Sequence, residues 1–178
     1  MPRRYRLFLI VMAISVAIDQ ISKYWARLAL EKYGDHGYAL IEGFFHLRLS
    51  FNRGIAWGMF SSLTGGRIVL SLVNLLACVA IFLYVRKAND SQKWFASALG
   101  LVGGGAFGNA IDRILVGQVT DFILWQVRSY RWPVFNIADA SLVIGVAILF
   151  LDIGHEQRRK NRQPEGTPTD KPTDKPTE

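Results

Sequence analysis

Three aspartates of this chain stand where apolar segments begin or end. Asp112 follows Gly108-Asn109-Ala110-Ile111, Asp121 lies within Val119-Thr120-Asp121-Phe122-Ile123, and Asp139 lies within Phe135-Asn136-Ile137-Ala138-Asp139. A carboxylate beside hydrocarbon is costly unless something pairs or uses it, so each is a candidate for function. Two carboxylates that share a proton can act on water as base and acid, because like charges about 3 Å apart cannot both ionise. We therefore interpret two of these acids as a dyad that hydrolyses a peptide bond at the outer edge of a membrane.

Other hydrolytic chemistries have weaker support. A serine or cysteine nucleophile needs a nearby base, and the histidines are His36, His46 and His155, the last of which is expected on the opposite side of the membrane. A zinc peptidase would need a ligand set such as H-E-x-x-H, which the sequence lacks. The single cysteine, Cys78, lies inside an apolar block, so we interpret it as a small buried residue.

The acids are positioned by four apolar blocks. At 178 residues, about half of them apolar, the chain is one domain by length. Each block approaches the roughly 17–25 residues that cross about 30 Å of hydrocarbon as a helix. A soluble bundle would show a polar stripe along each helix, whereas Ile68–Val85 carries only Ser71 and Asn74. The sequence predicts an all-α polytopic membrane protein with four transmembrane helices, at residues 7–30, 68–85, 95–111 and 134–153.

The basic residues orient these helices. The net charge of +7 would also suit a nucleic-acid-binding protein, but the Lys and Arg residues cluster beside the apolar blocks. With four crossings, three dense clusters share one side, which the positive-inside rule marks as cytoplasmic, together with both termini. The opposite side also carries basic residues, but they are spread over two longer connections. The two sides therefore differ in the density of Lys and Arg residues. The clusters are Arg3, Arg4 and Arg6; Arg86, Lys87 and Lys93; and Arg158, Arg159, Lys160 and Arg162.

The first block contains a polar group on one helix face. Asp19 and Lys23 are four residues apart and can pair. At about 1.5 Å per residue they lie in the outer half of the bilayer. Two roles fit them, namely an ion pair that fixes the helix end or direct participation in catalysis. The block also resembles a secretory signal with Ser15-Val16-Ala17 as a cleavage site, but cleavage would discard the residues just before Asp19, so an uncleaved helix fits better.

The first outer connection has the pattern of a strand. Phe45–Asn52 alternates apolar and polar residues, which predicts a half-buried strand, and turn residues flank it. Residues 55–60 form an apolar, aromatic continuation that we interpret as an amphipathic surface segment. We expect a small extracytoplasmic β-sheet on the membrane surface, with the periplasmic segment 32–66 belonging to a peptidase domain at residues 1–163. Residues 164–178 are polar and repetitive, so we expect a disordered cytoplasmic tail.

Small residues mark the third helix. Gly100, Gly104 and Gly108 recur at every fourth position, which lets helix backbones approach closely in lipid. A phosphate-binding loop is a poor interpretation, because no Lys-Ser/Thr follows the glycines.

Polar residues from separate segments fall on the same outer side, which favours a site over scattered helix caps. They are Asp19, Lys23, Asn52, Arg53, Asn109, Asp112, Asn136 and Asp139.

Five motifs in order carry a resemblance to a known family. With them, residues 7–153 resemble the bacterial lipoprotein signal peptidase family, signal peptidase II. Two departures are mild, since Thr120 stands where the family usually has valine and Trp57 where phenylalanine is common. The motifs are Asp19-Gln20-Ile21-Ser22-Lys23, Asn52-Arg53-Gly54-Ile55-Ala56-Trp57-Gly58, Gly108-Asn109-Ala110-Ile111-Asp112-Arg113, Val119-Thr120-Asp121-Phe122-Ile123 and Phe135-Asn136-Ile137-Ala138-Asp139.

The resemblance implies a membrane aspartic endopeptidase of the bacterial cytoplasmic (inner) membrane, with its active site near the outer leaflet. It would remove the signal peptide from a diacylglyceryl-modified prolipoprotein by cutting just before the lipidated cysteine. Membrane lipid would be a second partner, and we expect a monomer that needs no nucleic acid, metal or other cofactor.

By motif, the resemblance assigns Asp121 and Asp139 as the catalytic acids. Asp112 is the rival of Asp121, and the sequence by itself does not separate them. Asp112 adjoins Arg113 and could be held ionised as its partner, whereas Asp121 lies past the helix end and could turn back toward Asp139. The residues expected to bind substrate or support the site are Asp19, Lys23, Asn52, Arg53, Gly54, Asn109, Asp112, Arg113 and Asn136.

Two other functions compete with the peptidase. A proton- or ion-coupled small membrane carrier would use the same intramembrane acids, but no inverted repeat relates the four blocks. A non-catalytic lipid-binding or assembly protein would not need two unpaired acids. Replacing Asp121 or Asp139 by Asn separates these functions, because only a peptidase would then accumulate uncleaved lipidated precursor.

Overall fold

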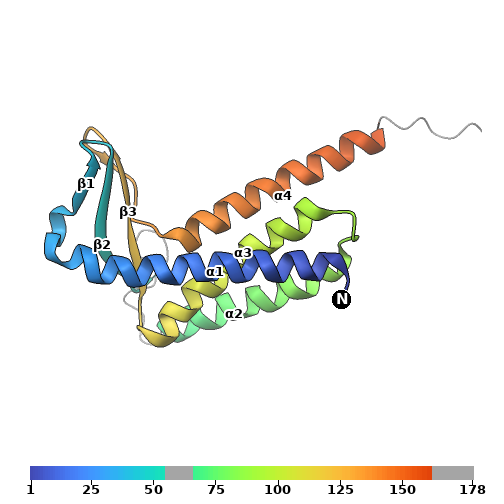
Figure 1. Ribbon diagram of the computed structural model, residues 1–178, viewed down its shortest axis with the longest axis horizontal. Coiled ribbons are helices and arrows are strands. Elements are labelled where there is room, and N and C mark those ends of the chain that lie inside the picture. The colour runs from blue at the N-terminus through green and yellow to red at the C-terminus, as the bar shows by residue number, and fades with distance from the viewer. Residues whose placement is uncertain (55–65, 162–178) are drawn as a thin grey trace, which may run out of the picture.

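The computed structural model describes residues 1–54 and 66–161 (Figure 1). The expected surface segment at residues 55–60 and the expected tail at residues 164–178 lie outside the described residues. Within the described ranges the helices are α1 (Arg3–Leu30), η1 (Glu31–His36), α2 (Gly66–Tyr84), η3 (Val85–Lys87), α3 (Lys93–Leu115) and α4 (Ile137–Asn161). The strands are β1 (Tyr38–Ile41), β2 (Phe45–Asn52), β3 (Val119–Val127) and β4 (Tyr130–Arg131).

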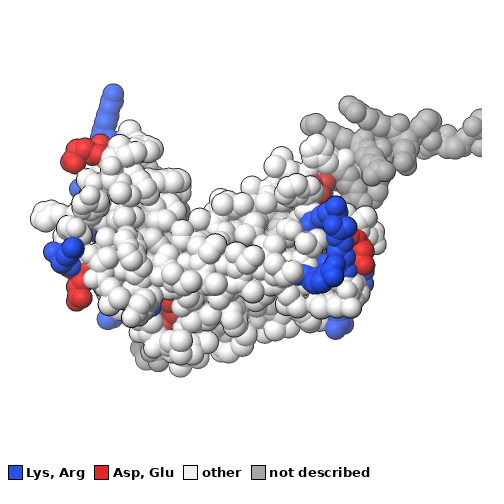
Figure 2. Space-filling model, viewed as in Figure 1, with Lys and Arg blue, Asp and Glu red and all other residues white. Residues whose placement is uncertain are grey.

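Four of the described helices are long and apolar enough to cross a membrane, which confirms the predicted number. Figure 2 shows that the charged side chains on the visible face gather mainly toward the two ends of the molecule, with a mostly uncharged band between them. Large apolar side chains such as Ile14, Leu76 and Val143 are exposed on the outer helix faces, as expected for helices surrounded by hydrocarbon. The spans are Arg3–His36, Ile68–Val85, Lys93–Leu115 and Ile137–His155.

Helix α3 is central and packs against α1, α2 and α4. A Cβ atom on Gly100 would lie 2.7 Å from the carbonyl oxygen of Phe8, and one on Gly104 would lie 2.7 Å from the Cβ of Ser15. On another face of α3, a Cβ on Gly105 would collide with the carbonyl oxygen of Ala138 at the start of α4. The predicted packing role of the glycines is confirmed, and it extends to a second helix face that the four-residue spacing did not indicate.

The described strands form one antiparallel sheet in the order β1-β2-β3-β4 at one end of the helices (Figure 1). Strand β2 has the predicted bounds, Phe45–Asn52. Strand β3 was not predicted, although its run of Val, Ile, Phe and Trp residues is typical of a strand. Ser50 of β2 pairs with Asp121 of β3, and a bulge separates this pair from the pair of Leu47 and Ile123. The sheet therefore holds one of the three aspartates in a fixed register.

Helix α4 begins at Ile137 rather than at residue 134, where the apolar block begins. Phe135 is still extended, because its N–H donates to the carbonyl oxygen of Ile123 at 3.0 Å. Asn136 then starts the helix. The apolar composition of residues 134–153 indicates a membrane span, but it does not show that the first of these residues are extended and that the helix begins only at Ile137.

An apolar cluster fastens the sheet to α1. Ala26 and Leu30 of α1 are buried against Phe122 of β3, with Leu47 of β2 packed beside them. Burial of such side chains is typically worth about 1.5–3 kcal/mol each. The sheet is therefore attached to the helices by its own core, which positions β3 beside α1.

Candidate active site

Asp121 is a buried carboxyl at the third position of β3. Only 3% of the residue is exposed, and its backbone pairs with Ser50 of β2. The side-chain Nδ2 of Asn136 donates a hydrogen bond to its Oδ1 at 2.7 Å. Strand pairing and this hydrogen bond fix the carboxyl beside the start of α4.

Asp139 lies in the first turn of α4, where Asn136 precedes the helix. The backbone N–H of Asp139 donates to Oδ1 of Asn136 at 2.9 Å, and the N–H of Asn136 donates back to Oδ2 of Asp139 at 3.3 Å. This reciprocal pair is a capping box, which satisfies N–H groups that have no partner within the helix. A carboxylate at this end is also favoured by the helix dipole. These contacts within one short stretch of the chain fix the Asp139 carboxylate relative to Asn136.

Two asparagines join these acids. Asn136 contacts Asp121 through its side chain and Asp139 through its backbone N–H. Asn109 donates from Nδ2 to Oδ1 of Asp139 at 2.8 Å, and its Oδ1 accepts from Nδ2 of Asn136 at 3.1 Å. The two carboxyls thus face a shared set of amide groups, although they come from a strand and a helix.

The pKa of Asp121 is raised from 3.8 to about 7. Burial, which penalises the charged form, is the largest cause, and the negative charge of Asp139 is the second. Hydrogen bonds from Asn136 and Asn52 and the charge of Lys23 lower the pKa, but they do not outweigh the first two causes. A protonated carboxyl beside a second carboxyl can donate a proton while its neighbour accepts one, which is the requirement for acting on water.

Lys23 is a fully buried cation that contacts three polar residues. Its Nζ lies 2.9 Å from Oδ2 of Asp19 and 3.8 Å from Oδ2 of Asp112, and it donates to Oδ1 of Asn109 at 2.9 Å. Since an ammonium group only donates, it holds the oxygen of Asn109 toward itself and leaves the Nδ2 group to donate to Asp139. Lys23 of α1 therefore orients the side-chain amide of Asn109 on α3, and this amide contacts Asp139 of α4.

Asp19 supports α4 rather than the end of its own helix. Its Oδ1 accepts the backbone N–H of Ala138 in the first turn of α4 at 2.9 Å. Its Oδ2 forms the ion pair with Lys23. Gly108 leaves room for this carboxylate, because a Cβ there would lie 2.5 Å from Oδ2. Of the two roles that the sequence left open, the geometry favours a structural one.

Asp112 is fully buried and faces donors from two other elements. The backbone N–H of Thr120 donates to its Oδ2 at 2.8 Å, while Arg27 lies 3.7 Å from Oδ1 and Lys23 lies 3.8 Å from Oδ2. The charges of Asp112 and the adjacent Arg113 interact, but the ion pairs of Asp112 within the described residues are those with Lys23 and Arg27. Asp112 thus ties α1, α3 and β3 together.

The predicted residues of the first outer connection divide into two groups. Asn52 forms a side-chain hydrogen bond with the β3 carboxyl, and its Oδ1 accepts the N–H of Gly54 at 2.9 Å. The carbonyl oxygen of Gly54 accepts from the guanidinium of Arg113 at 3.0 Å. Arg53 is exposed and donates to Gln118 at 3.2 Å. The structure thus brings Asn52, Gly54 and Arg113 to the site, and it places Arg53 outside it.

Three supporting residues were not assigned from the motifs. Gln20 donates to Oδ2 of Asp19 at 3.0 Å. Arg27 donates to Oγ1 of Thr120 at 2.7 Å, besides lying near Asp112. The four-residue spacing from Lys23 to Arg27 was the available signal, since it puts both cations on one face of α1. For the backbone N–H of Thr120 no signal existed, because any residue except proline would supply it.

Comparisons with known proteins agree on one family. The model of the signal peptidase (SPase) II family matches residues 11–154. A lipoprotein signal peptidase of Geobacter metallireducens is 36% identical over 162 residues, covering 91% of this chain and 99% of that protein. Another, of Ralstonia nicotianae, is 39% identical over 150 residues, covering 84% of this chain and 83% of that protein. A solved structure described as a bacterial membrane enzyme superposes with a TM-score of 0.73 at 28% identity, covering 90% of this chain and 93% of the other.

Proposed function

This chain belongs to the signal peptidase II family, and on that premise we propose that Asp121 and Asp139 form an aspartic dyad that removes signal peptides from lipidated prolipoproteins. The relatives are lipoprotein signal peptidases, so the reaction is hydrolysis of a peptide bond. The cut lies just before the lipidated cysteine of the diacylglyceryl-modified precursor. The carrier alternative has no support in these relatives.

The observation that carries the choice of acids is the contact of Asn136 with both carboxyls. Asp112 is the rival, but donors from Lys23, Arg27 and Thr120 surround it. Its carboxylate therefore has a structural task, whereas the hydrogen bonds to the dyad come from neutral amides, which leave it free to exchange a proton.

The mechanism uses one water molecule and one shared proton. Asp121 begins protonated and Asp139 begins as the carboxylate. Asp139 takes a proton from water while the water oxygen attacks the scissile carbonyl carbon, and Asp121 gives its proton to the carbonyl oxygen. The tetrahedral diol then collapses: the C–N bond breaks, Asp139 returns its proton to the amine, and a diol hydroxyl returns a proton to Asp121. Both acids end as they began, and the products are a carboxylic acid and an amine.

The surrounding polar residues hold this arrangement. Lys23 and Asn136 both donate to the oxygen of Asn109, so its Nδ2 group remains directed at Asp139. Arg113 lies close enough to both dyad acids for their charges to interact, and its guanidinium holds the carbonyl oxygen of Gly54. Preorganised groups of this kind lower the reorganisation needed when charge moves during the reaction.

The proposed setting is the bacterial inner membrane, with both termini cytoplasmic and the sheet and dyad at the outer leaflet. The dense basic flanks of the spans support this orientation. The lipid chains of the substrate would stay in the bilayer and hold the scissile bond beside the dyad, with the protein acting as a monomer. Equal rates for lipidated and unlipidated precursor would contradict this anchoring.

The deciding experiment is cleavage of a lipidated precursor by purified wild type and by Asp112→Asn, Asp121→Asn and Asp139→Asn variants, side by side. We expect the wild type to release the signal peptide and both dyad variants to leave the precursor intact at normal protein level. Full activity in either dyad variant would overturn the assignment.

A further inference from the structure

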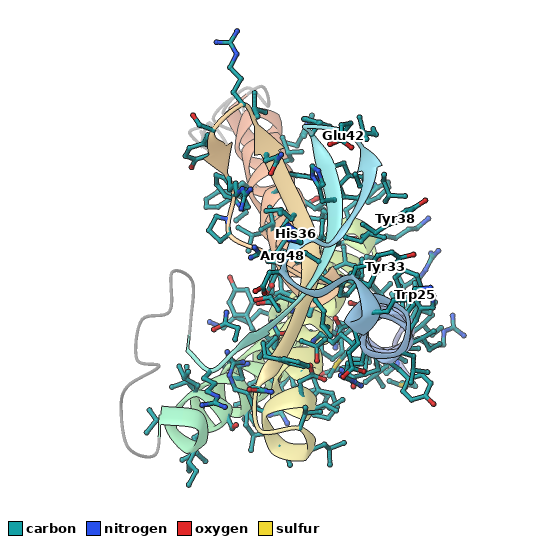
Figure 3. The ribbon with its side chains drawn as sticks, turned by 90° about the vertical axis from the view of Figure 1, so that its left-hand side faces the viewer. Trp25, Tyr33, His36, Tyr38, Glu42 and Arg48 are labelled. Atoms are coloured by element: carbon teal, nitrogen blue, oxygen red, sulfur yellow. The ribbon has the colours of Figure 1, made fainter. Side chains whose placement is uncertain are left out.

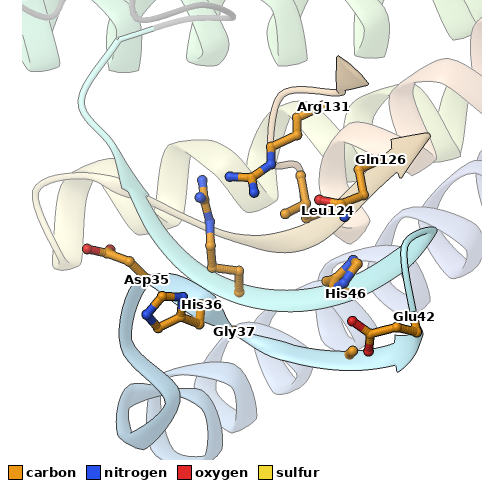
Figure 4. A pocket seen from close by; sticks show the side chains of 10 residues that line it. Asp35, His36, Gly37, Glu42, His46, Leu124, Gln126 and Arg131 are labelled. Carbon is orange, nitrogen blue, oxygen red and sulfur yellow. The ribbon is translucent and has the colours of Figure 1, made fainter. Parts of the chain in front are cut away.

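A polar cavity of about 390 Å³ lies on the sheet (Figure 4). Its lining combines η1, the β1–β2 hairpin, β3 and β4, so residues far apart in the sequence meet there. Asp35 and His36 come from η1, Glu42 from the hairpin, and Arg131 from β4. The proposed mechanism uses none of them.

The cavity lies on the face of β3 opposite to that of Asp121. Successive strand residues point to opposite faces, so Leu124 and Gln126, which line the cavity, point away from the face that carries Asp121. The register agrees, because His46 pairs with Leu124 and Arg131 pairs with Gln126, and cross-strand partners share a face. The cavity is therefore separate from the dyad but is built on the same strand.

His46 carries an unused hydrogen-bonding atom in this cavity. The residue is 8% exposed, and its Nδ1 has no hydrogen-bond partner among the described residues. Figure 4 shows the ring between Gln126 and Glu42, among the side chains that line the cavity. Because buried polar atoms nearly always have a partner, a ligand that fills the cavity is expected to supply one.

The charged side chains that line the cavity indicate what kind of ligand it can bind. Arg48 and Arg131 present guanidinium groups, Asp35 and Glu42 present carboxylates, and none of these four forms an ion pair within the part of the chain that the structure describes. Figure 3 looks onto this end of the molecule and shows Arg48, His36 and Glu42 on the near side. A multiply charged anion would be repelled by both carboxylates.

A short peptide with an acidic side chain matches the whole lining. Guanidinium groups bind a carboxylate through two parallel hydrogen bonds, and carboxylates accept the N–H groups of a peptide backbone. Leu124 and Ala39 add small apolar contacts for the chain between these groups. The volume lies near the lower end of the roughly 300–1,000 Å³ that is usual for ligand sites, which suits a few residues.

The substrate itself can reach the cavity. Gln126 follows Asp121 by five positions on β3, which at about 3.3 Å per residue is about 17 Å. A chain that starts at the dyad must also pass around the edge of the sheet to reach the cavity, which lengthens this path. An extended chain covers about 3.3–3.6 Å per residue, so about five residues span the distance along the strand and a few more are needed to round its edge.

Resting on the proposed peptidase function, we propose that this cavity binds the mature part of the prolipoprotein substrate, through an acidic side chain about six to ten residues after the cleavage site. Arg48 and Arg131 hold the carboxylate, and His46 hydrogen-bonds the bound segment. The cavity thereby selects among precursors without touching the scissile bond.

The test uses purified full-length protein and lipidated precursors whose mature part is uncharged except for one Asp. The Asp stands about three, eight or fourteen residues after the cleavage site, and a fourth precursor has none. Arg131→Gln is the main variant, because Arg131 is exposed and its loss does not disturb a core. Lys32→Gln is the matched control, since it removes an exposed positive charge of η1 that does not line the cavity.

We expect Arg131→Gln to raise KM about fivefold or more for the precursor with Asp near position eight, with kcat unchanged. The other precursors and the Lys32→Gln variant should show wild-type KM. A second arm measures the fluorescence anisotropy of a labelled, unlipidated mature peptide that carries the same Asp. This peptide should bind to the wild type and bind more weakly to Arg131→Gln and His46→Ala. His46→Gln should recover part of the affinity that is lost in His46→Ala.

Equal KM for all four precursors overturns the proposal, as does an equal effect of Lys32→Gln. Peptide binding without any effect of Asp position on KM assigns the cavity to a separate acidic peptide and also overturns it. If wild type cleaves no precursor, the peptidase function fails, and the anisotropy arm alone then decides whether the cavity binds the peptide.

Discussion

The carboxylate of Asp19 accepts the backbone N–H of Ala138 at 2.9 Å, across 119 positions of the chain. A residue of α1 thus caps the first turn of the helix that carries Asp139. The same carboxylate is paired with Lys23, which orients Asn109 toward Asp139. The position of the proposed dyad therefore depends on a buried ion pair between two residues of α1.

Breaking this ion pair from one side should cost more than removing both charges. Asp19→Leu leaves Lys23 buried and unpaired by its main partner, and we expect a loss of about 3–5 kcal/mol of stability, measured by thermal unfolding in detergent. The double variant Asp19→Leu with Lys23→Met should recover much of that stability. Its cleavage rate should stay low, because neither the α4 cap nor the orientation of Asn109 returns. A double variant that regains full activity would show that the pair acts only on stability.

The pH dependence of cleavage should follow Asp121. Its pKa of about 7 means that the proton needed by the scissile carbonyl is present below pH 7 and lost above it. We expect kcat to fall as pH rises through about 7 in a pH–rate profile. In Asp139→Asn, loss of the neighbouring negative charge should lower the pKa of Asp121, which infrared spectroscopy of the carboxyl band can measure. An unchanged pKa in that variant would contradict direct coupling.

The same shift predicts how stability depends on pH. The pKa of Asp121 is higher in the folded protein than its ordinary value of 3.8, so the folded state keeps a proton that the unfolded state releases. The stabilising contribution is full below about pH 4 and is lost as pH rises toward 7. Asp121→Asn should flatten this decline in thermal unfolding, while Glu31→Gln, at an exposed acid of η1, should leave it unchanged.

Asp112→Asn should separate a structural acid from a catalytic one. The amide oxygen can still accept the N–H of Thr120, but the charge that faces Lys23 and Arg27 is lost. We expect reduced stability with measurable cleavage, whereas Asp121→Asn should lose activity by about 10⁴-fold or more with near-normal unfolding. Single-turnover cleavage and unfolding curves of both variants check this. The reverse order of activities would make Asp112 the partner of Asp139.

Two neighbouring glycines of α3 provide a matched pair for packing. A Cβ at Gly105 collides with the carbonyl oxygen of Ala138 and lies 2.7 Å from Leu142 Cγ, so Gly105→Ala should push α4 away and cost about 1–3 kcal/mol or more. A Cβ at Gly103 meets Phe8 at 3.5 Å, an ordinary contact, so Gly103→Ala should be nearly neutral. Cleavage should fall in the first variant only, because Asp139 moves with α4. Equal effects of the two substitutions would argue against close packing of α3 on α4.

Features that depend on neighbouring residues could be predicted from the sequence. The length of the apolar blocks indicates helices that cross hydrocarbon, because bilayer thickness sets the number of residues. Alternation in Phe45–Asn52 indicated β2, and Asn136 with Asp139 forms a cap that needs only a three-residue spacing. The motifs identified the family, which the comparisons confirm.

Contacts between distant segments were decided only by the tertiary structure. Asp112 forms ion pairs with Lys23 and Arg27 of another helix, and Arg53, which belongs to a motif, lies outside the site. The capping of α4 by Asp19 had no local signal either. The physical reason is that successive side chains of a helix point about 100° apart around its axis. The partner of a buried charged residue is therefore determined by how the helices pack against each other and not by which residue is next in the chain.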